Sequence, residues 1–196
     1  SEAAPPPPPE VCSAEFSLGF SGDNADLPIG ISGSDFGQDV ACTLTTANND
    51  CDDTGAQGWS FGITGDGLEI TAITTDGTAA ENASEVGFDL SEVTDAGAIQ
   101  VTILGFEQFN MLPSSGTETV ASVTIATTYP DAATETKTLG YVNGLVGSGL
   151  AVDNIVAFDD QDIDPATTGY ELTLTGVDNN YVTLDFDASG QVNIAD

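Results

Sequence analysis

Two stretches rich in aspartate have the spacing of oxygen ligands for a metal ion. In the first, residues 159–171 (DDQDIDPATTGYE), acidic residues alternate with other types, and the candidate ligands are Asp160, Asp162, Asp164 and Glu171. Calcium takes about six to eight oxygens, which alternate side chains of a loop can supply. Pro165 stands where EF-hand loops have glycine. The stretch is therefore either a calcium site or a solvated acidic loop.

The second stretch, residues 185–196 (DFDASGQVNIAD), fits the EF-hand spacing more closely. Glycine stands at position 6 and valine at position 8, and the candidate ligands at positions 1, 3, 5 and 12 are Asp185, Asp187, Ser189 and Asp196. DASG is also good turn chemistry, so the alternative is a hairpin in which YVTLDF turns through residues 187–190 into QVNI. A third acidic group, Asp50, Asp52 and Asp53, surrounds Cys51.

The charge of the chain excludes several functions. Lys+Arg is 1 and Asp+Glu is 32, so the formal charge is 1 − 32 = −31, and Lys137 is the sole side-chain cation. Nucleic acids, anionic membranes and phosphate substrates are recognised by Lys and Arg, so we expect no nucleic-acid partner and no membrane insertion. With no histidine, no Ser-His or Cys-His dyad and no imidazole zinc ligand can form. We expect no enzymatic activity.

Two other kinds of site carry little specificity here. A pair of carboxylates suffices for glycoside hydrolysis, but among 32 acidic residues such pairs arise by chance. Aromatic residues spread singly over the chain are either core residues or a platform that stacks on sugars. They are Trp59, Tyr129, Tyr141, Tyr170 and Tyr181.

Three cysteines suggest an oxidising compartment. The closest pair, Cys42 and Cys51, would close a polar loop (TLTTANND), and we predict a disulfide between them. Cys12 is then left over, either as a buried thiol or as a site of intermolecular pairing. The chain begins at Ser1 without an initiator methionine, so we expect an exported product located outside the cell or on its surface.

The candidate ligand, aromatic and cysteine residues named above must be positioned by short strands. Hydrophobic residues make up 40% of the chain, and segments that alternate apolar and polar residues are separated by Gly, Asn and Asp. About a dozen such segments, with no amphipathic helix, predict an all-β antiparallel sandwich. The residues 91–98 could form one helical turn, and GLVGSG at 144–149 is expected to be a loop. The predicted strands are Ala14–Phe20, Leu27–Ile31, Val40–Thr45, Gly58–Ile63, Leu68–Thr74, Val86–Leu90, Ala98–Phe106, Thr119–Tyr129, Thr136–Val142, Asn154–Phe158, Tyr170–Thr175 and Tyr181–Phe186.

The chain divides into an arm, residues 1–13, and a single sandwich domain, residues 14–196. The arm contains SEAAPPPPPE, which favours polyproline II and cannot enter a sheet interior. It leads directly into a strand with Phe16, Leu18 and Phe20 on one face. Such a strand can pair within its own molecule or be donated to a neighbouring subunit.

Three stretches resemble the cohesin-like modules of secreted bacterial proteins. GWSFGITGDGLEITAIT (58–74) is similar to the opening of such modules, and residues 121–125 with GLVGSGLAVDNIVAF (144–158) are similar to their later strands. Residues 185–196 resemble the calcium loop of a dockerin repeat. The resemblance implies a jelly-roll β-sandwich that binds partners or builds extracellular assemblies without catalysis.

Two functions follow from these observations. The first is a structural subunit that self-assembles into a filament or surface layer through donation of the 14–20 strand, with Ca²⁺ at the acidic clusters offsetting repulsion between subunits. The second is a monomeric cohesin-like display module that binds a protein or a carbohydrate. Deleting residues 1–20 would abolish assembly in the first case and leave a stable binding module in the second.

Overall fold

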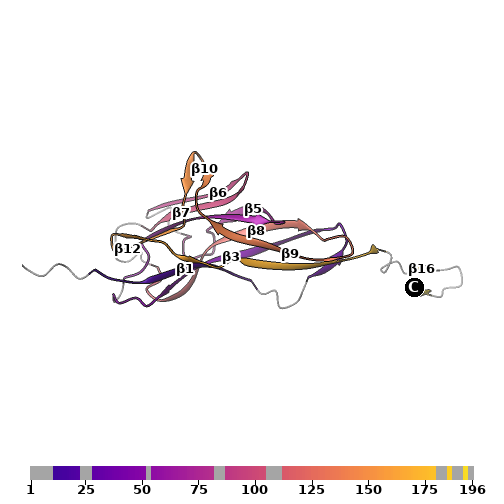
Figure 1. Ribbon diagram of the computed structural model, residues 1–196, viewed down its shortest axis with the longest axis horizontal. Coiled ribbons are helices and arrows are strands. Elements are labelled where there is room, and N and C mark those ends of the chain that lie inside the picture. Colours follow the sequence, from indigo (N-terminus) through magenta and orange to yellow (C-terminus); the bar gives the residue numbers. More distant parts are fainter. Residues whose placement is uncertain are drawn as a thin grey trace, which may run out of the picture.

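The computed structural model describes residues 11–22, 28–51, 54–81, 87–104 and 112–179, with the backbone of residues 185–186 and 192–193. In these ranges the strands form two large sheets around a common core (Figure 1). The predicted all-β sandwich is therefore confirmed. Within the same ranges no helix has the length and hydrophobicity needed to cross a membrane.

The first sheet has five strands in the order β14-β1-β3-β8-β5. Their bounds are β1 Glu15–Ser21, β3 Asp35–Ala47, β5 Glu69–Thr74, β8 Gly116–Thr128 and β14 Ala166–Thr167. The β1–β14 pair is parallel and the others are antiparallel. Threonine recurs along both β3 and β8, which suits long paired strands.

The second sheet follows the path β13-β12-β4-β9-β15-β2, and the β7–β6 pair joins it at the other edge of β4. Its strands are β2 Ile29–Ile31, β4 Gly58–Asp66, β6 Phe88–Thr94, β7 Gly97–Ile103, β9 Thr134–Val142, β12 Ile155–Phe158, β13 Gln161–Ile163 and β15 Tyr170–Val177. β9 pairs with residues 62–66 of β4 and β12 with residues 58–60. These two strands therefore lie end to end along β4.

A hairpin of β10 (Leu145–Gly147) and β11 (Leu150–Val152) separates β9 from β12. The expected loop at 144–149 is thus wrong, because a turn at Ser148–Gly149, with Gly149 at a φ of 89°, allows the flanking residues to pair. The expected helical turn at 91–98 is wrong as well. That stretch forms the end of β6, a turn at residues 95–96 and the start of β7.

The core lies between the two sheets. Alternate residues of β3, β4 and β8 point inward, and Phe61 and Phe158 are fully buried there. The ring of Phe158 in the second sheet packs edge-on against Phe16 of β1 in the first, with ring centroids 5.3 Å apart. Burial of such rings contributes about 1.5–3 kcal/mol each. The sandwich is therefore closed by residues from both ends of the chain.

Strand β1 is paired within its own molecule. Phe16 and Leu18 are buried in the core, and Phe20 stacks on Tyr141 with ring centroids 4.7 Å apart. β3 pairs along one edge of β1 and β14 along the other. In this chain Phe16, Leu18 and Phe20 therefore close the sandwich to which they belong, the first of the two alternatives for this strand; its donation to a neighbouring subunit stays a prediction.

The disulfide joins Cys12 to Cys51, with 5.5 Å between the two Cα atoms, and Cys42 is a free, buried thiol. The prediction of a Cys42–Cys51 bond was wrong because no loop begins at Cys42. β3 continues to Ala47, and its register pairs Cys42 with Phe20 of β1 and Ala121 of β8. The thiol of Cys42 therefore points into the core, away from the segment that carries Cys51.

Candidate functional site

Strand β7 turns Gln100 and Thr102, together with Ala98, into the core, and it turns Val101 and Ile103 outward; Ile99, also on the outer side, is covered by the β10–β11 hairpin. Gln100 and Thr102 are 0% and 1% exposed, whereas Val101 is half-buried and Ile103 is 43% exposed. A strand that covers a core ordinarily buries its apolar side, because that side gains most from leaving water. This orientation leaves a row of aliphatic side chains on the outside of the second sheet.

Hydrogen bonds hold the polar side of β7 inside. The amide nitrogen of Gln100 donates to Thr102 Oγ1 at 2.9 Å and to the carbonyl oxygen of Val120 at 3.2 Å. The hydroxyls of Thr102 and Thr75 donate to the two carboxylate oxygens of Asp89 at 3.1 and 3.2 Å. The Gln100 amide nitrogen, the Thr102 hydroxyl and the Asp89 carboxylate have partners, so their burial carries a smaller penalty than that of unpaired polar groups; Gln100 Oε1 is buried without a hydrogen-bond partner among the described residues. The network thus fixes which side of β7 faces out.

Neighbouring strands continue the apolar row. Directly paired residues of adjacent strands point to the same side of a sheet. The register pairs Ile103 with Phe88 and with Gly58, and Gly58 in turn with Ala157. We call the following side chains the apolar face: Phe88 and Leu90 of β6, Val101 and Ile103 of β7, and Ile155 and Ala157 of β12. Val101, Ile103, Ile155 and Ala157, together with Gly58, line a shallow hollow of about 150 Å³.

Two glycines seat the β10–β11 hairpin beside the apolar face. A methyl group at Gly147 would overlap the Cδ1 atom of Ile99, and one at Gly62 would lie 2.8 Å from the Cβ of Leu145. The absence of side chains at Gly62 and Gly147 therefore lets the hairpin lie directly on β4 and β7. Figure 1 shows the hairpin standing out from the body of the sandwich next to β6 and β7.

A carboxylate of β6 fastens the tip of the hairpin. Glu92 accepts hydrogen bonds from the backbone nitrogen of Ser148 at 2.9 Å and from its hydroxyl at 2.5 Å. These bonds favour the charged carboxylate and lower the pKa of Glu92 below its ordinary value, with the hydroxyl contributing most.

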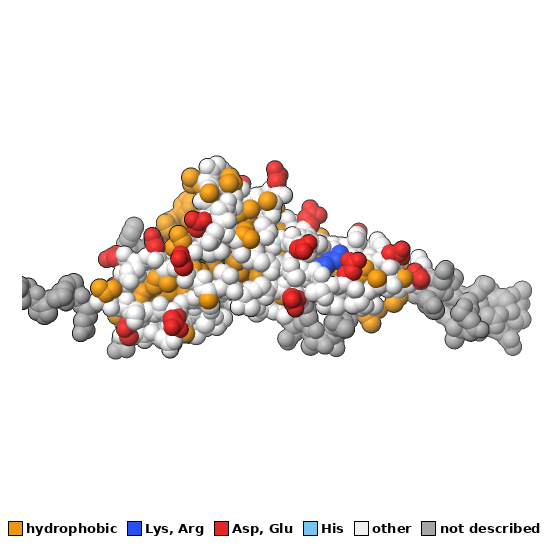
Figure 2. Space-filling model, viewed as in Figure 1, with side chains coloured by type: hydrophobic (Ala, Val, Ile, Leu, Met, Phe, Trp, Pro, Cys, Tyr) orange, Lys and Arg blue, Asp and Glu red, His pale blue; other side chains and the backbone are white. Residues whose placement is uncertain are grey.

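The hairpin adds large exposed apolar side chains to this region. Val146 is 59% exposed and Leu150 is 73% exposed. Leu150 pairs with Gly147, so it lies on the side of the hairpin that faces β7. Figure 2 shows hydrophobic side chains gathered over the hairpin, β6, β7 and β12, with carboxylates at their border. Contiguous exposed apolar surface rimmed by polar groups is typical of protein interaction sites.

The first predicted calcium stretch is spread over several elements. Asp160 is the second residue of the two-residue turn between β12 and β13, where Asp159 and Asp160 have φ values of 46° and 58°. Asp162 lies in β13, Asp164 follows it, and Glu171 lies in β15, all exposed. In the described part of the chain these four carboxylates do not form a group with ligand atoms within 4.8 Å of one another.

Within the described ranges, Cys12, Asp50 and Cys51 do have candidate ligand atoms that lie within 4.8 Å of one another. The two sulfurs are already bonded to each other, so they are not available as thiolate ligands. Asp50 accepts hydrogen bonds from the nitrogen and hydroxyl of Ser13, at 2.6 and 2.8 Å, and these bonds lower its pKa. Asp50 therefore anchors the segment next to the disulfide. Asp52 and Asp53 lie outside the described residues.

The second predicted calcium stretch is described only in part. Its backbone forms β16 (Asp185–Phe186) and β17 (Val192–Asn193), which pair antiparallel as in the hairpin alternative. The side chain of Asp185, and Asp187, Ser189 and Asp196 as a whole, lie outside the described residues. Calcium binding by this stretch stays a prediction.

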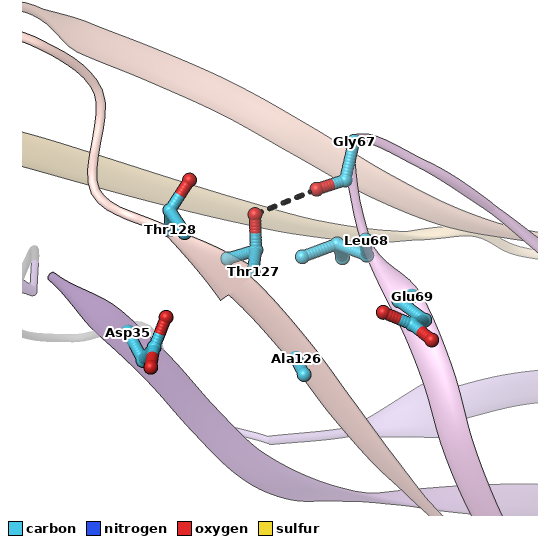
Figure 3. Close-up of a pocket in the computed structure, with 7 residues that line it drawn as sticks. All are labelled: Asp35, Gly67, Leu68, Glu69, Ala126, Thr127 and Thr128. Carbon is cyan, nitrogen blue, oxygen red and sulfur yellow. Dashed lines mark hydrogen bonds between the residues drawn. The ribbon is translucent and has the colours of Figure 1, made fainter. Parts of the chain in front are cut away.

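Figure 3 shows a wider, acidic hollow of about 480 Å³ at the end of the first sheet. Asp35 of β3 and Glu69 of β5 lie on either side of β8. The hydroxyl of Thr127 contacts the Gly67 carbonyl oxygen at 2.8 Å and the Lys137 ammonium at 2.7 Å. Its lining is mixed, with the carboxylates of Asp35 and Glu69 and the hydroxyls of Thr127 and Thr128 beside Leu68 and Ala126.

The aromatic residues considered as a sugar platform serve the core instead. Trp59 and Tyr170 are buried, and Tyr141 packs against Phe20 and donates its hydroxyl hydrogen to the Gly19 carbonyl oxygen at 2.7 Å. Tyr129 packs edge-on against Phe36. Tyr181 lies outside the described residues. The four described rings therefore do not form an exposed stacking surface.

Cohesin modules are among the solved structures that superpose on this chain. A cohesin from a type I cohesin–dockerin complex of Clostridium thermocellum superposes with a TM-score of 0.58 at 5% identity, covering 87% of this chain and 99% of that one. The sixth cohesin of Acetivibrio cellulolyticus scaffoldin B, solved with a dockerin, gives 0.49 at 14% identity, with 83% and 99% covered. A non-cellulosomal cohesin of Archaeoglobus fulgidus gives 0.44 at 12%, with 83% and 91% covered.

The first of these likenesses confirms the cohesin-like fold that the sequence resemblance predicted. No protein-family model and no curated protein sequence matches the chain. The apolar face was missed by the sequence analysis. Its signal is the alternation AIQVTI in β7, in which both sides contain β-branched residues and the more hydrophobic side is the outer one.

Proposed function

We propose that this protein is a non-catalytic protein-binding module that docks a partner on the apolar face, beside the β10–β11 hairpin. The observation that carries the proposal is the orientation of β7. A buried polar network holds Gln100 and Thr102 inside, while Ile103 and its neighbours remain in contact with water. Exposed aliphatic surface that is kept in place in this way favours a role in binding over a role in packing.

The fold supports the same proposal. The Clostridium thermocellum cohesin comes from a cohesin–dockerin complex, so this architecture serves protein recognition in that protein. We propose a protein partner for the present chain, and a location outside the cell or on its surface, which the disulfide also favours. Self-assembly by strand donation has less support, because β1 has hydrogen-bonded neighbours on both edges.

The test replaces one apolar side chain on the face. Ile103→Asp places a charge at a position that is already 43% exposed, so the fold should tolerate it while docking is lost. Ile29→Asp is the matched control, because Ile29 is 67% exposed on β2, remote from the apolar face in the strand order. Each variant is immobilised and exposed to the secreted proteins of the source organism.

We expect the wild type and Ile29→Asp to retain the same protein, and Ile103→Asp to retain at least about tenfold less of it. Circular dichroism and the melting temperature check that both variants fold. Equal retention by Ile103→Asp would contradict docking on this face.

A further inference from the structure

The apolar face has an acidic border on the side of β12 and β13. Asp162 pairs with Ala157, so its exposed carboxylate stands on the same side of the sheet as the apolar face. Asp160 lies in the adjoining turn, and exposed Asp153 lies between β11 and β12, two residues before Ile155. The Asp153 carbonyl oxygen accepts a hydrogen bond from Ser60 Oγ at 2.6 Å, which fixes that backbone beside the face. We call Asp153, Asp160 and Asp162 the acidic rim.

The chain has no cation with which to neutralise this rim. Its one Lys or Arg side chain, Lys137 of β9, donates to Thr127 Oγ1 at 2.7 Å and to the Thr128 carbonyl oxygen at 3.2 Å, both on β8 of the other sheet. At about 3.3 Å per residue, Asp160 and Asp162 lie within a Debye length of each other at physiological salt, whereas Asp153 stands at the opposite end of β12, farther away than that length. A partner that covers them therefore has to supply the opposite charge.

A second copy of this chain is a poor occupant for the same reason. Each molecule has a formal charge of −31, so two acidic rims brought together would repel. A neutral apolar partner would also remove water from the edges of the rim without returning hydrogen bonds to it, and desolvated carboxylates without partners are costly. A cationic border on the partner satisfies the carboxylates and accelerates encounter with this acidic molecule.

Resting on the proposed function, we propose that the partner surface has apolar side chains that meet the apolar face and Lys or Arg side chains that meet the acidic rim. The partner is thus a protein surface with an apolar centre and a basic edge. The β10–β11 hairpin borders the face with the apolar side chains Val146 and Leu150, so we place the partner's basic groups opposite Asp160 and Asp162, on the β12–β13 side.

The experiment uses synthetic helical peptides as probes. One peptide has a leucine stripe bordered by lysines, a second replaces the lysines with glutamates, and a third replaces them with glutamines. Binding is measured by fluorescence anisotropy at about 50 and 300 mM NaCl, because screening weakens exposed ion pairs. We expect the lysine peptide to bind tightest and to lose affinity as salt is raised.

Two triple variants separate the rim from the general negative charge. The rim variant is Asp153→Asn/Asp160→Asn/Asp162→Asn; asparagine suits position 160 because it tolerates a positive φ. The control variant, Asp35→Asn/Asp66→Asn/Glu69→Gln, removes the same charge from exposed positions away from the rim, two of which are drawn in Figure 3. We expect the rim variant to weaken the lysine peptide about tenfold and the control variant to weaken it less than twofold.

If the two triple variants weaken binding of the lysine peptide equally, the proposed role of the acidic rim is wrong. That result would show that the peptide is attracted by the overall negative charge alone. Tighter binding of the glutamate or glutamine peptide would contradict the role of the rim as well. Ile103→Asp tests the proposed function separately. Ile103→Asp leaving the binding of all three peptides unchanged, while the rim variant weakens binding of the lysine peptide, would contradict docking on the apolar face. The proposal of a partner with basic groups would still stand.

Discussion

Cys42 is a single residue whose chemistry is decided by its surroundings. It is fully buried in β3, and burial in apolar surroundings disfavours the thiolate and raises the pKa of the thiol to about 12. Tyr141, packed beside it, has its pKa raised above its ordinary value, also chiefly by burial. Neither group is suited to act as a nucleophile near neutral pH. Cys42 is therefore a packing residue.

Thiol titration distinguishes the two disulfide pairings. With Cys12 bonded to Cys51, the native protein should react with Ellman's reagent at no position, and one thiol per chain should appear on denaturation without reductant. Peptide mapping of the non-reduced protein should recover Cys12 linked to Cys51. A bond between Cys42 and Cys51 would instead leave Cys12 accessible, because that residue is only half-buried, and one thiol would react in the native state.

The sequence predicted the presence of a disulfide but not its partners. Spacing favoured Cys42 with Cys51, since short loops close readily. The choice in fact depends on where β3 ends, and the polar residues TTAN that suggested a loop belong in part to the strand. Thr45, for example, pairs with Thr117, and their hydroxyls lie 2.7 Å apart. Threonine is as acceptable in an exposed strand position as in a loop, so local composition could not decide.

At the scale of elements, strand positions were largely predictable and strand orientation was not. The segment AIQVTILGF was expected to form a strand because it alternates with a period of two, and residues 98–103 do so; residues 105–106 lie outside the described residues. The same alternation is satisfied whichever side faces the core. Only the partners of Gln100 and Thr102, the Val120 carbonyl oxygen of β8 and the Asp89 carboxylate of β6, decide that the polar side is buried. The apolar face could not be inferred without those contacts.

The hairpin was hidden for a related reason. GLVGSG contains three glycines in six residues, a composition typical of loops. Two of them are needed for structural reasons: Gly149 adopts a positive φ in the turn, and Gly147 lets the hairpin approach Ile99. The hairpin therefore depends on contacts with β4, β6 and β7 more than on local strand propensity.

The hairpin should loosen in acid. Because the folded pKa of Glu92 is lowered, its contribution is present above the unfolded pKa of about 4.3 and is lost as pH falls through the folded value. Hydrogen-exchange protection factors of β10–β11 amides should therefore fall below about pH 4, while those of β3 and β8 persist. Glu92→Gln should show the lower protection already at pH 7, and Glu69→Gln should not. Unchanged hairpin protection in Glu92→Gln would contradict the tether.

At the scale of the whole molecule, the charge dominates the response to solution conditions. With 32 acidic residues and one Lys or Arg, most charge pairs repel, and compaction brings them closer than they are in the unfolded chain. Added NaCl screens this repulsion. We expect the melting temperature to rise between about 10 and 500 mM NaCl by several degrees, measured by differential scanning calorimetry at pH 7. A fall over this range would show that repulsion is not the main electrostatic effect.

Calcium acts through the same charge, so its specific binding has to be separated from screening. A site that binds Ca²⁺ in the folded state alone adds stability in proportion to occupancy, whereas screening depends on ionic strength. We expect 5 mM CaCl₂ (roughly the concentration for a weak extracellular site) to raise the melting temperature more than MgCl₂ does at the same ionic strength. If the C-terminal stretch binds Ca²⁺, Asp185→Asn/Asp187→Asn should abolish the additional rise in melting temperature that CaCl₂ gives over MgCl₂. If the 159–171 stretch binds Ca²⁺, Asp160→Asn/Asp162→Asn should abolish it. Identical shifts with both salts would contradict a calcium site in either stretch, and the acidic residues would then act through their summed charge.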